Sequence, residues 1–426
     1  MKAPDCIVID FETLPIRQRP QYPPSPVGVA IRWPGEWGRY YAWGHPTNKN
    51  CDEAAALTAL YRAWEHPLPK LFFNAKFDLA VAYERLEMPR LEWDQVHDAM
   101  FQAFLCDPHA RQLGLKPLAE NLLSWPTEER SQLDEWIMAH SAQLLAAHPW
   151  NRSSPNQHKI TKKQCGAWIF ATPGDLAGVY AIGDVDRTLA LHEKLWPIIQ
   201  DEGMGAAYDR ERRVLPIFME NEEIGIRTDL ERLEQDVVGY GNTLVYVEDW
   251  LRAQLRASGL NFDADADVSS VLLDRGIVPP ENWQKTASGQ LSMAKDNLLP
   301  EYFTGEGGAA IASALGYRNR LKTCLTMFMQ PWADQARERR GYISTNWNQT
   351  RGDDKGGTRT GRPSTYDPNL LNVSKKWDGR DDGYVHPAFL GVAELPLCRE
   401  YLMPDDDEEF LHRDFDGQEL RIFAHF

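Results

Sequence analysis

Two carboxylates, one residue apart, close the first apolar run of the chain. Asp10 and Glu12 follow Cys6-Ile7-Val8-Ile9, and this run is typical of a buried strand. Because residues i and i+2 of a strand project to the same face, both side chains should enter one space. Like charges that close are costly without a cation between them, and a hard divalent ion is the simplest candidate. A plain acidic turn is the alternative, because Asp-x-Glu is a common sequence.

Three further residues could take part in the same chemistry. Asp78 follows the apolar run Leu71-Phe72-Phe73 and is expected to open a helix, where a carboxylate can also be a simple cap. Tyr180 and Asp184 lie four residues apart on a helix predicted from Pro173, which places them on one helical face. A tyrosine there is usually a core residue and an aspartate usually faces solvent, so neither is informative alone.

The elements that must position these residues can be placed from the sequence pattern. A hairpin is expected over residues 29–43 and an amphipathic helix over 52–66. Residues 126–170 are more polar and are interpreted as a solvent-facing insertion with no chemistry. Beyond residue 200 the pattern predicts mainly helices, with a glycine turn at Gly225 that leads into a short strand.

Composition indicates a globular chain of several domains. The 426 residues are 43% hydrophobic, which is enough for two or three separate cores. Six cysteines are scattered without a Cys-x-x-Cys pair, so a reduced cytosolic compartment is expected. The apolar run before Asp10 is too short for a signal sequence, and no run approaches membrane-spanning length, which argues against secretion and membrane insertion.

The charge is unevenly distributed. The net charge of −16 argues superficially against a nucleic-acid partner. Residues 310–376, however, hold twelve Lys or Arg against five Asp or Glu, a local balance of +7. An acidic body with a basic groove is compatible with a metal-dependent nuclease, which must devote carboxylates to its ions.

Taken together, these motifs carry a specific resemblance. In chain order, Asp10 with Glu12, Asp78, and Tyr180 with Asp184 resemble the three motifs of the proofreading 3′–5′ exonucleases of the DEDD superfamily, in the tyrosine variant. The similarity covers roughly residues 1–200 and includes Asn74 and Lys76 in the second motif. Gly183 departs from the acidic residue that many relatives carry before the last aspartate.

The resemblance implies a fold, cofactors and roles. It implies a ribonuclease-H-like α/β domain whose four carboxylates hold two Mg²⁺ or Mn²⁺ ions for in-line cleavage of a phosphodiester. Tyr180 would orient the attacking water, since a phenol with a pKa near 10 is a poor base at neutral pH. Asn74 would contact the nucleic acid.

A second resemblance covers the remaining chain. The segment from Met219 to Asp229 is similar to the start of the thumb of family A DNA polymerases, and Arg318, Arg320 and Lys322 could then meet phosphates. The alternative for these three cations is an ordinary solvated helix face.

The segments Thr358-Arg359-Thr360-Gly361-Arg362 and Asp367-Pro368-Asn369-Leu370 resemble a sequence block of the family A palm. By this match Arg362 and Asn369 would touch the duplex. Leu371 replaces a common glutamine, which removes one polar contact.

The last residues resemble polymerase motif A. Phe410-Leu411-His412-Arg413-Asp414 reads as a strand that delivers a carboxylate, followed by a helix that carries Glu419. The resemblance implies that Asp414 is a catalytic metal ligand and that Glu419 favours deoxynucleotides. The acidic run 405–409 is interpreted as a solvated turn. The fingers helix and the later His-Asp-Glu motif are not found in this sequence, so we expect no unaided primer extension.

The sequence therefore predicts a family A DNA polymerase with a proofreading exonuclease, present here as an exonuclease domain (1–200), a helical thumb (201–335) and a partial palm (336–426). Its expected partners are primer-template DNA, single-stranded 3′ ends and a C-terminal polymerase fragment, in a bacterial or phage-infected host cytoplasm. The alternatives are a freestanding exonuclease of DNA or RNA with a duplex-binding arm, and a silent nucleic-acid-binding subunit, which the intact carboxylate set disfavours.

Overall fold

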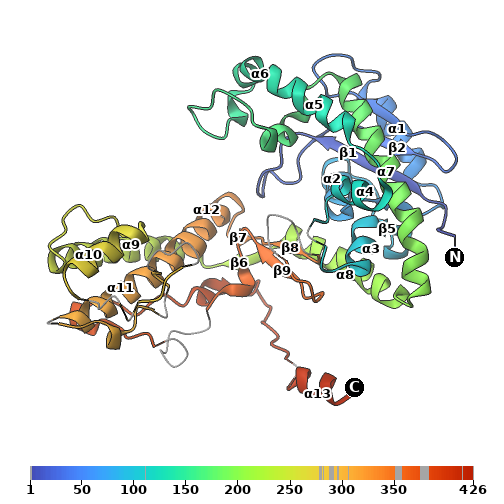
Figure 1. Ribbon diagram of the computed structural model, residues 1–426. Coiled ribbons are helices and arrows are strands. Elements are labelled where there is room, and N and C mark those ends of the chain that lie inside the picture. The colour runs from blue at the N-terminus through green and yellow to red at the C-terminus, as the bar shows by residue number, and fades with distance from the viewer. Residues whose placement is uncertain are drawn as a thin grey trace. The chain divides into compact units, whose positions relative to one another are not determined.

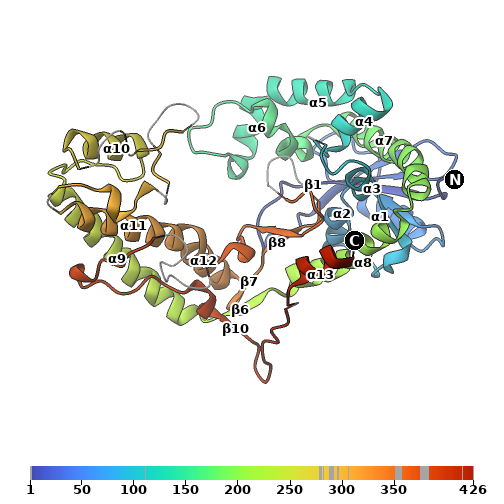
Figure 2. The same cartoon turned by 60° about the horizontal axis from the view of Figure 1, so that its bottom comes forward.

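The computed structural model separates the chain into two compact units. It describes residues 2–110, 112–277, 281, 283–286, 292–294, 297–305, 307–350, 357–374, 383–414 and 416–425. The first unit joins Met1–Ile224 to Ser344–Leu371, and the second joins Gly225–Ile343 to Asn372–Phe426. Figures 1 and 2 show the elements of both units. The division into three domains at residues 200 and 335 remains a prediction.

The first unit is built on a five-stranded mixed sheet with the order β3-β2-β1-β4-β5. Its strands are β1 (Ile7–Thr13), β2 (Pro26–Arg32), β3 (Arg39–Ala42), β4 (Lys70–Phe72) and β5 (Val96–Asp98). Central β1 is antiparallel to β2 and parallel to β4. The strand that ends in Asp10 and Glu12 and the hairpin over residues 29–43 are thereby confirmed.

The side chains of β1 alternate between two apolar cores, one on each face of the sheet. Ile7, Ile9 and Phe11 pack into the cluster that includes residues of α1 and α2. Val8 packs into the other cluster, which includes residues of the long helix α7. Asp10 shares the parity of Val8, and so does Glu12, so both carboxylates lie on the α7 side of the sheet.

Helices cover both faces of this sheet (Figure 1). They are α1 (Glu53–Trp64), α2 (Ala75–Arg85), α3 (Ala99–Cys106), α4 (Leu115–Leu123), α5 (Glu128–Ala139), α6 (Ser141–Ala147), α7 (Gly174–Asp201) and α8 (Gly205–Ile224). Asp52 caps α1 through the backbone N–H of Ala55, as the acidic start of that helix suggests. The helices expected over residues 52–66 and after Pro173 are confirmed.

The segment 126–170 is more than a solvent-facing insertion. It forms α5, α6 and the 3₁₀ helix Lys162–Ala171, and α5 packs on α7. Leu133, Ile137 and Trp168 are almost completely buried. Polar residues outnumber apolar ones in this segment, which hid the narrow apolar stripe that attaches α5 to the unit.

A small hairpin from far along the chain completes the first unit. Strands β8 (Asn346–Asn348) and β9 (Ser364–Tyr366) pair antiparallel. The ring of Trp347 stacks on Phe218 of α8, with centroids 4.7 Å apart. Buried Glu222 accepts hydrogen bonds from the backbone N–H of Trp347 at 2.6 Å and from Lys76 Nζ at 2.7 Å.

The second unit is mainly helical, with a small sheet of order β10-β6-β7. Its strands and helices are β6 (Ile226–Thr228), α9 (Leu230–Gln254), α10 (Asp265–Asp274), α11 (Gly308–Thr323), a π-helical turn (Cys324–Met329), α12 (Gln330–Glu338), β7 (Tyr342–Ile343), β10 (Leu402–Met403) and α13 (Gln418–His425). Helix α9 packs along α11. The glycine turn is confirmed, because Gly225 has φ of +79° between α8 and β6.

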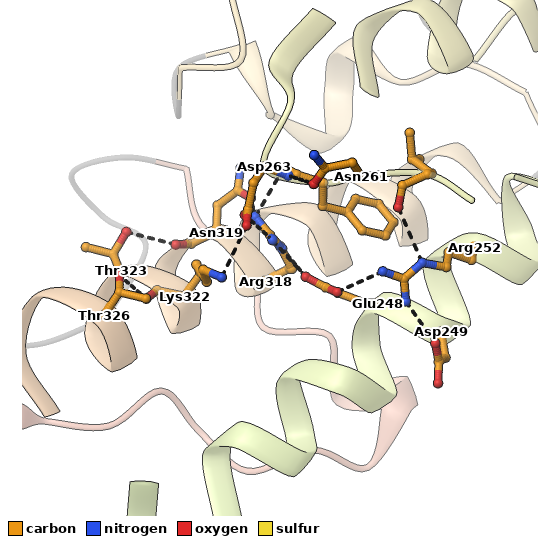
Figure 3. Close-up of polar contacts among 12 residues, drawn as sticks. Glu248, Asp249, Arg252, Asn261, Asp263, Arg318, Asn319, Lys322, Thr323 and Thr326 are labelled. Atoms are coloured by element: carbon orange, nitrogen blue, oxygen red, sulfur yellow. Dashed lines mark hydrogen bonds and ion pairs between the residues drawn. The ribbon is translucent and has the colours of Figure 1, made fainter. Parts of the chain in front are cut away.

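Arg318 does not offer its charge to phosphates. It is only 4% exposed, and its Nη2 atom lies 2.7 Å from Glu248 Oε1 and 2.5 Å from Asp263 Oδ1 (Figure 3). Lys322 Nζ also lies 3.2 Å from Asp263. The expectation for Arg318 is therefore wrong, because the acidic partners on α9 and in the following loop could not be paired with it from sequence.

The predicted strand of motif A does not form. Residues Phe410–Asp414 have no regular structure, and the side chains of Phe410 and Leu411 are exposed. In the part of the chain that the structure describes, no strand pairs with this run, which leaves its apolar residues uncovered. The following helix forms as α13, while Phe415 and Phe426 lie outside the described residues. None of the described helices combines the length and apolarity needed to cross a membrane.

Candidate active site

Asp10 and Glu12 lie together on one face of β1, as their spacing predicts. Glu12 is 7% exposed, so its carboxylate is largely removed from water. Desolvation and the charge of Asp184 raise the pKa of Asp10 to about 8, with a smaller opposing effect from Lys116. Desolvation, followed by Asp10 and Asp184, also raises the pKa of Glu12. The charges of neighbouring carboxylates thus raise the pKa of both Asp10 and Glu12, so a cation near them would stabilise their ionised forms.

Asp78 reaches the same space from α2, although it does not open that helix. The helix begins at Ala75 after Asn74, which adopts the left-handed conformation with φ of +66°. Asp78 Oδ1 accepts a hydrogen bond of 3.0 Å from the backbone N–H of Phe11. Desolvation and the charge of Asp10 raise the pKa of Asp78. The cap interpretation is therefore wrong, and Asp78 binds the backbone of β1 at Phe11, next to Asp10.

Asp98, at the end of β5, fixes the start of α2. Its carboxylate accepts hydrogen bonds from the backbone N–H groups of Asn74, at 3.1 Å, and Ala75, at 2.8 Å. Desolvation outweighs these bonds and raises its pKa to about 6. Asp98 thus holds the turn that places Asn74 and Asp78, a role that nothing in its local sequence marked.

Tyr180 and Asp184 lie on one face of α7 and meet two cations from neighbouring helices. Lys116 Nζ of α4 lies 2.7 Å from both carboxylate oxygens of Asp184 and 4.0 Å from the centroid of the Tyr180 ring. Arg130 Nη1 of α5 donates a hydrogen bond of 3.2 Å to the Tyr180 hydroxyl. Sequence reasoning missed both cations, because each lies on a separate helix with no motif of its own.

Tyr180 is held in its protonated form. Desolvation, then the charges of Asp184 and Glu12, raise the pKa of its phenol, and the opposing effect of Arg130 is smaller. A phenol that keeps its proton at neutral pH can donate a hydrogen bond but cannot act as a general base. This agrees with an orienting role.

The donor set suits a hard divalent cation. Asp10, Glu12, Asp78 and Asp184 supply only carboxylate oxygens, the ligands that Mg²⁺ and Mn²⁺ prefer. Among the described residues, however, no three Asp, Glu, His or Cys side chains are gathered closely enough to hold an ion as they stand. Lys116 occupies both oxygens of Asp184. The residues fit the ion in chemistry, and Lys116 would have to release Asp184 when the ion binds.

A groove opens beside Asn74 in the first unit. It has a volume of about 720 Å³ and is lined by residues that follow β1, by the start of α2 and by residues of the β8–β9 hairpin. Its walls include Arg17, Asn74, Phe77, Asn346 and Tyr366. The apolar and amide side chains of these walls suit a chain of stacked bases.

The remaining predicted residues divide between the two units. Arg362 is exposed, and Asn369 Oδ1 accepts a hydrogen bond of 3.0 Å from Thr365; both belong to the first unit. Asp414 and Glu419 are exposed residues of the second unit. Their predicted roles remain predictions.

Comparison with known proteins assigns the family. Residues 5–200 match the family model described as 3′-5′ exonuclease, and residues 233–426 match that of DNA polymerase family A. DNA polymerase DpoZ of Salmonella phage PMBT28 is 25% identical over 94% of this chain and 59% of its own length. DpoZ of Vibrio phage phiVC8 is 26% identical over 63% of this chain and 40% of its own length.

A solved structure shares the fold. It is the POL domain of Pol1 from M. smegmatis, in complex with DNA primer-template and dNTP, with a TM-score of 0.60 and 20% identity over 89% of this chain and 53% of that one. The fold and the carboxylate face define a ribonuclease-H-like 3′–5′ exonuclease domain joined to a polymerase segment. The chain belongs to the family A DNA polymerases, members of which use divalent metal ions, and the phage relatives place it with the phage-type members. It spans about half the length of the curated relatives it matches.

Proposed function

We propose that the first unit is a metal-dependent 3′–5′ exonuclease that removes nucleotides from DNA 3′ ends and proofreads for a family A polymerase. The observation that carries this proposal is that Asp78 of α2 accepts the backbone N–H of Phe11, between Asp10 and Glu12, while Tyr180 and Asp184 lie on α7, which packs on the same strand. Two Mg²⁺ or Mn²⁺ ions are the cofactors that this donor set would hold.

Each residue of the site would have a separate task in the proposed reaction. Bound divalent ions would supply charge stabilisation at the attacking and leaving oxygens. The four carboxylates would hold them in a water-poor space. Tyr180 would donate its hydroxyl proton in a hydrogen bond that orients the attacking water. Asn74 and the groove beside it would bind the unpaired 3′ end, with bases stacked on its aromatic walls.

The polymerase segment would bind primer-template DNA. We propose that Arg362 contacts a phosphate and that Asn369 meets the duplex edge, while Asp414 binds a metal ion and Glu419 selects deoxynucleotides. Arg362→Gln should weaken binding of many duplex sequences alike and lower the salt slope by about one unit. An unchanged slope would remove Arg362 from the interface.

We also propose that further polymerase residues, in a longer chain or in a C-terminal fragment, cover α13. Leu420, Ile422 and Phe423 of this helix are 75%, 52% and 83% exposed. Mixing the chain with a candidate C-terminal fragment should restore primer extension. We infer a bacterial or phage-infected host cytoplasm as the place of action, on the sources of the relatives.

The decisive experiment is a degradation assay on a 5′-labelled single-stranded oligonucleotide. With Mg²⁺ or Mn²⁺ the chain should produce a ladder that shortens from the 3′ end, and Asp10→Ala combined with Glu12→Ala should abolish it. Glu135→Ala, which removes an exposed carboxylate of α5, is the matched control and should be fully active. Undiminished degradation by the double variant would refute the site, and an RNA strand of equal sequence shows whether the nuclease also cuts RNA.

A further inference from the structure

Helix α5 brings a guanidinium group to the phenol of Tyr180. Arg130 Nη1 lies 3.2 Å from the Tyr180 hydroxyl, and the Arg130 Cζ atom lies 5.5 Å from the centre of the Tyr180 ring. The Arg130 side chain is 25% exposed, so water reaches it only partly. This contact comes from the segment to which the sequence assigned no chemistry.

One ion pair holds Arg130, and a second attaches its helix to α7. Its Nε atom lies 2.9 Å from Asp134 Oδ1, one turn along α5, and the Asp134 side chain is only 3% exposed. Its neighbour Glu129 lies 2.6 Å from Arg187 Nη1 of α7, a pair that anchors α5 on the helix that carries Tyr180. A guanidinium held by a buried carboxylate keeps its direction, because its planar fork has few alternative partners.

The chemistry of the contact determines how the Tyr180 hydroxyl points. Arginine has only donor hydrogens, so the phenol oxygen must be the acceptor in this hydrogen bond. The single hydroxyl proton is then directed away from Arg130. The two negative charges that most raise the pKa of this phenol are those of Asp184, one turn along α7, and Glu12 of β1.

We propose that Arg130 is a positioning residue of the exonuclease reaction, which fixes the Tyr180 hydroxyl so that its proton points at the attacking water. Asp134 supports it by holding the guanidinium. The inference rests on the proposed function of the first unit, and it goes further by giving α5 a task in the reaction. Lys116 contributes separately, since it lies over the face of the Tyr180 ring and binds the carboxylate of Asp184.

Two other roles for Arg130 make different predictions. A guanidinium that contacted the DNA backbone would act without Tyr180, and its loss would raise KM. If the ion pair of Arg130 with Asp134 were purely structural, its loss would lower stability. The Tyr180 hydroxyl would then be unaffected in the fraction of the protein that stays folded. A positioning role predicts a loss in kcat that exists only while the Tyr180 hydroxyl exists.

A double-variant cycle tests the proposal in the full chain. Arg130→Gln should lower kcat for the single-stranded oligonucleotide about tenfold, the equivalent of one charge-assisted hydrogen bond, with KM nearly unchanged. In a Tyr180→Phe background the same substitution should have no further effect. Arg130→Lys should recover part of the loss, and Arg39→Gln, which changes an exposed arginine of β3, should match the unaltered chain.

A second measurement needs neither metal nor activity. The chain has fifteen tyrosines, which can be replaced by 3-fluorotyrosine and followed by fluorine NMR, with Tyr180→Phe identifying the Tyr180 signal. Arg130→Gln should shift that signal in the metal-free protein, and Arg39→Gln should leave it in place. If Arg130→Gln fails to fold, Asp134→Asn should produce the same shift and the same dependence on Tyr180.

The outcomes separate this inference from the proposed function. Absence of metal-dependent shortening by the unaltered chain would refute the proposed function itself. If the chain is active but Arg130→Gln lowers kcat equally in both backgrounds, or leaves the fluorine signal unmoved, Arg130 does not act through Tyr180 and the inference is wrong. The inference is supported if Arg130→Gln lowers kcat only while the Tyr180 hydroxyl is present and also shifts the fluorine signal of Tyr180.

Discussion

Replacing Lys76 by methionine should loosen the β8–β9 hairpin from the body of the first unit. The Lys76 ammonium lies 2.7 Å from Glu222, and the side chains are 18% and 3% exposed. Glu222 in turn accepts the backbone N–H of Trp347. Lys76→Met leaves a buried carboxylate with one neutral donor in place of its cation.

The expected cost follows from this geometry. Removing one partner of a buried ion pair costs about 3 to 5 kcal/mol of stability. Because water reaches the partly exposed Lys76, we expect the lower value. A loss of about 3 kcal/mol corresponds to local opening roughly a hundred times more frequent. The double variant Lys76→Met with Glu222→Met should recover part of this stability, because no charge is then left buried. Recovery is incomplete because the backbone N–H and C=O groups of Trp347 lose Glu222 and Lys76 as partners.

Hydrogen exchange measured by mass spectrometry reports this opening directly. Peptides that cover residues 344–350 should exchange faster in Lys76→Met, while those of β1 should not change. Arg90→Gln is the matched control, because the pair of Arg90 with Glu223 is 53% and 41% exposed and should contribute about 0.5 kcal/mol or less. Equal protection of residues 344–350 in Lys76→Met and the unaltered chain would refute the reasoning.

Three further outcomes are expected. Burial holds the pKa of His97 well below 6.5 and lowers the pKa of His192 to about 4 in the folded chain. The unfolded chain therefore takes up protons first, and stability should fall as pH drops from 6.5 towards 4. In chemical denaturation His192→Gln should flatten this dependence and exposed His158→Gln should not, and identical pH slopes would contradict the assignment. Lys116→Met should tighten Mn²⁺ binding about tenfold, measured by calorimetry or electron paramagnetic resonance, because the Lys116 ammonium no longer competes with the ion for Asp184. Exposed Lys163→Met serves as control, and an unchanged Mn²⁺ affinity of Lys116→Met would show that Lys116 does not compete. Arg318→Met should lower stability by about 2 kcal/mol, because it removes charge-assisted hydrogen bonds while Glu248 keeps Arg252 and half-exposed Asp263 keeps Lys322. The salt slope of DNA binding should stay unaltered, whereas a reduced slope would return Arg318 to the phosphate contacts.

The candidate site could be anticipated because its chemistry is local in sequence. The strand period places Asp10 and Glu12 together, and the helical period does the same for Tyr180 and Asp184. Each pair needs only its own element to form. The sheet and α7 then bring the pairs to one space, and the order of motifs identified the family.

The partners of that site could not be anticipated, because they depend on tertiary contacts. Lys116 and Arg130 reach Tyr180 from helices 64 and 50 positions away in the chain, and no periodicity within α4 or α5 points to it. Asp98 and Glu222 likewise act on segments distant in sequence. The strand predicted for motif A is absent for a related reason. Phe410 and Leu411 have apolar side chains suited to a sheet, but in the described residues no neighbouring strand supplies backbone partners.

The β8–β9 hairpin also affects how the protein can be divided. The backbone passes between the two units at residues 224–225, 343–344 and 371–372. A single proteolytic cut therefore cannot release the first unit intact, since truncation after Ile224 would strip Trp347 from Phe218 and leave Glu222 without its backbone donor. An isolated nuclease fragment would need residues 344–371 joined back through a short linker. Three covalent connections also restrict the units more than one connection would. Any hinge motion must therefore change the backbone at all three connecting segments together.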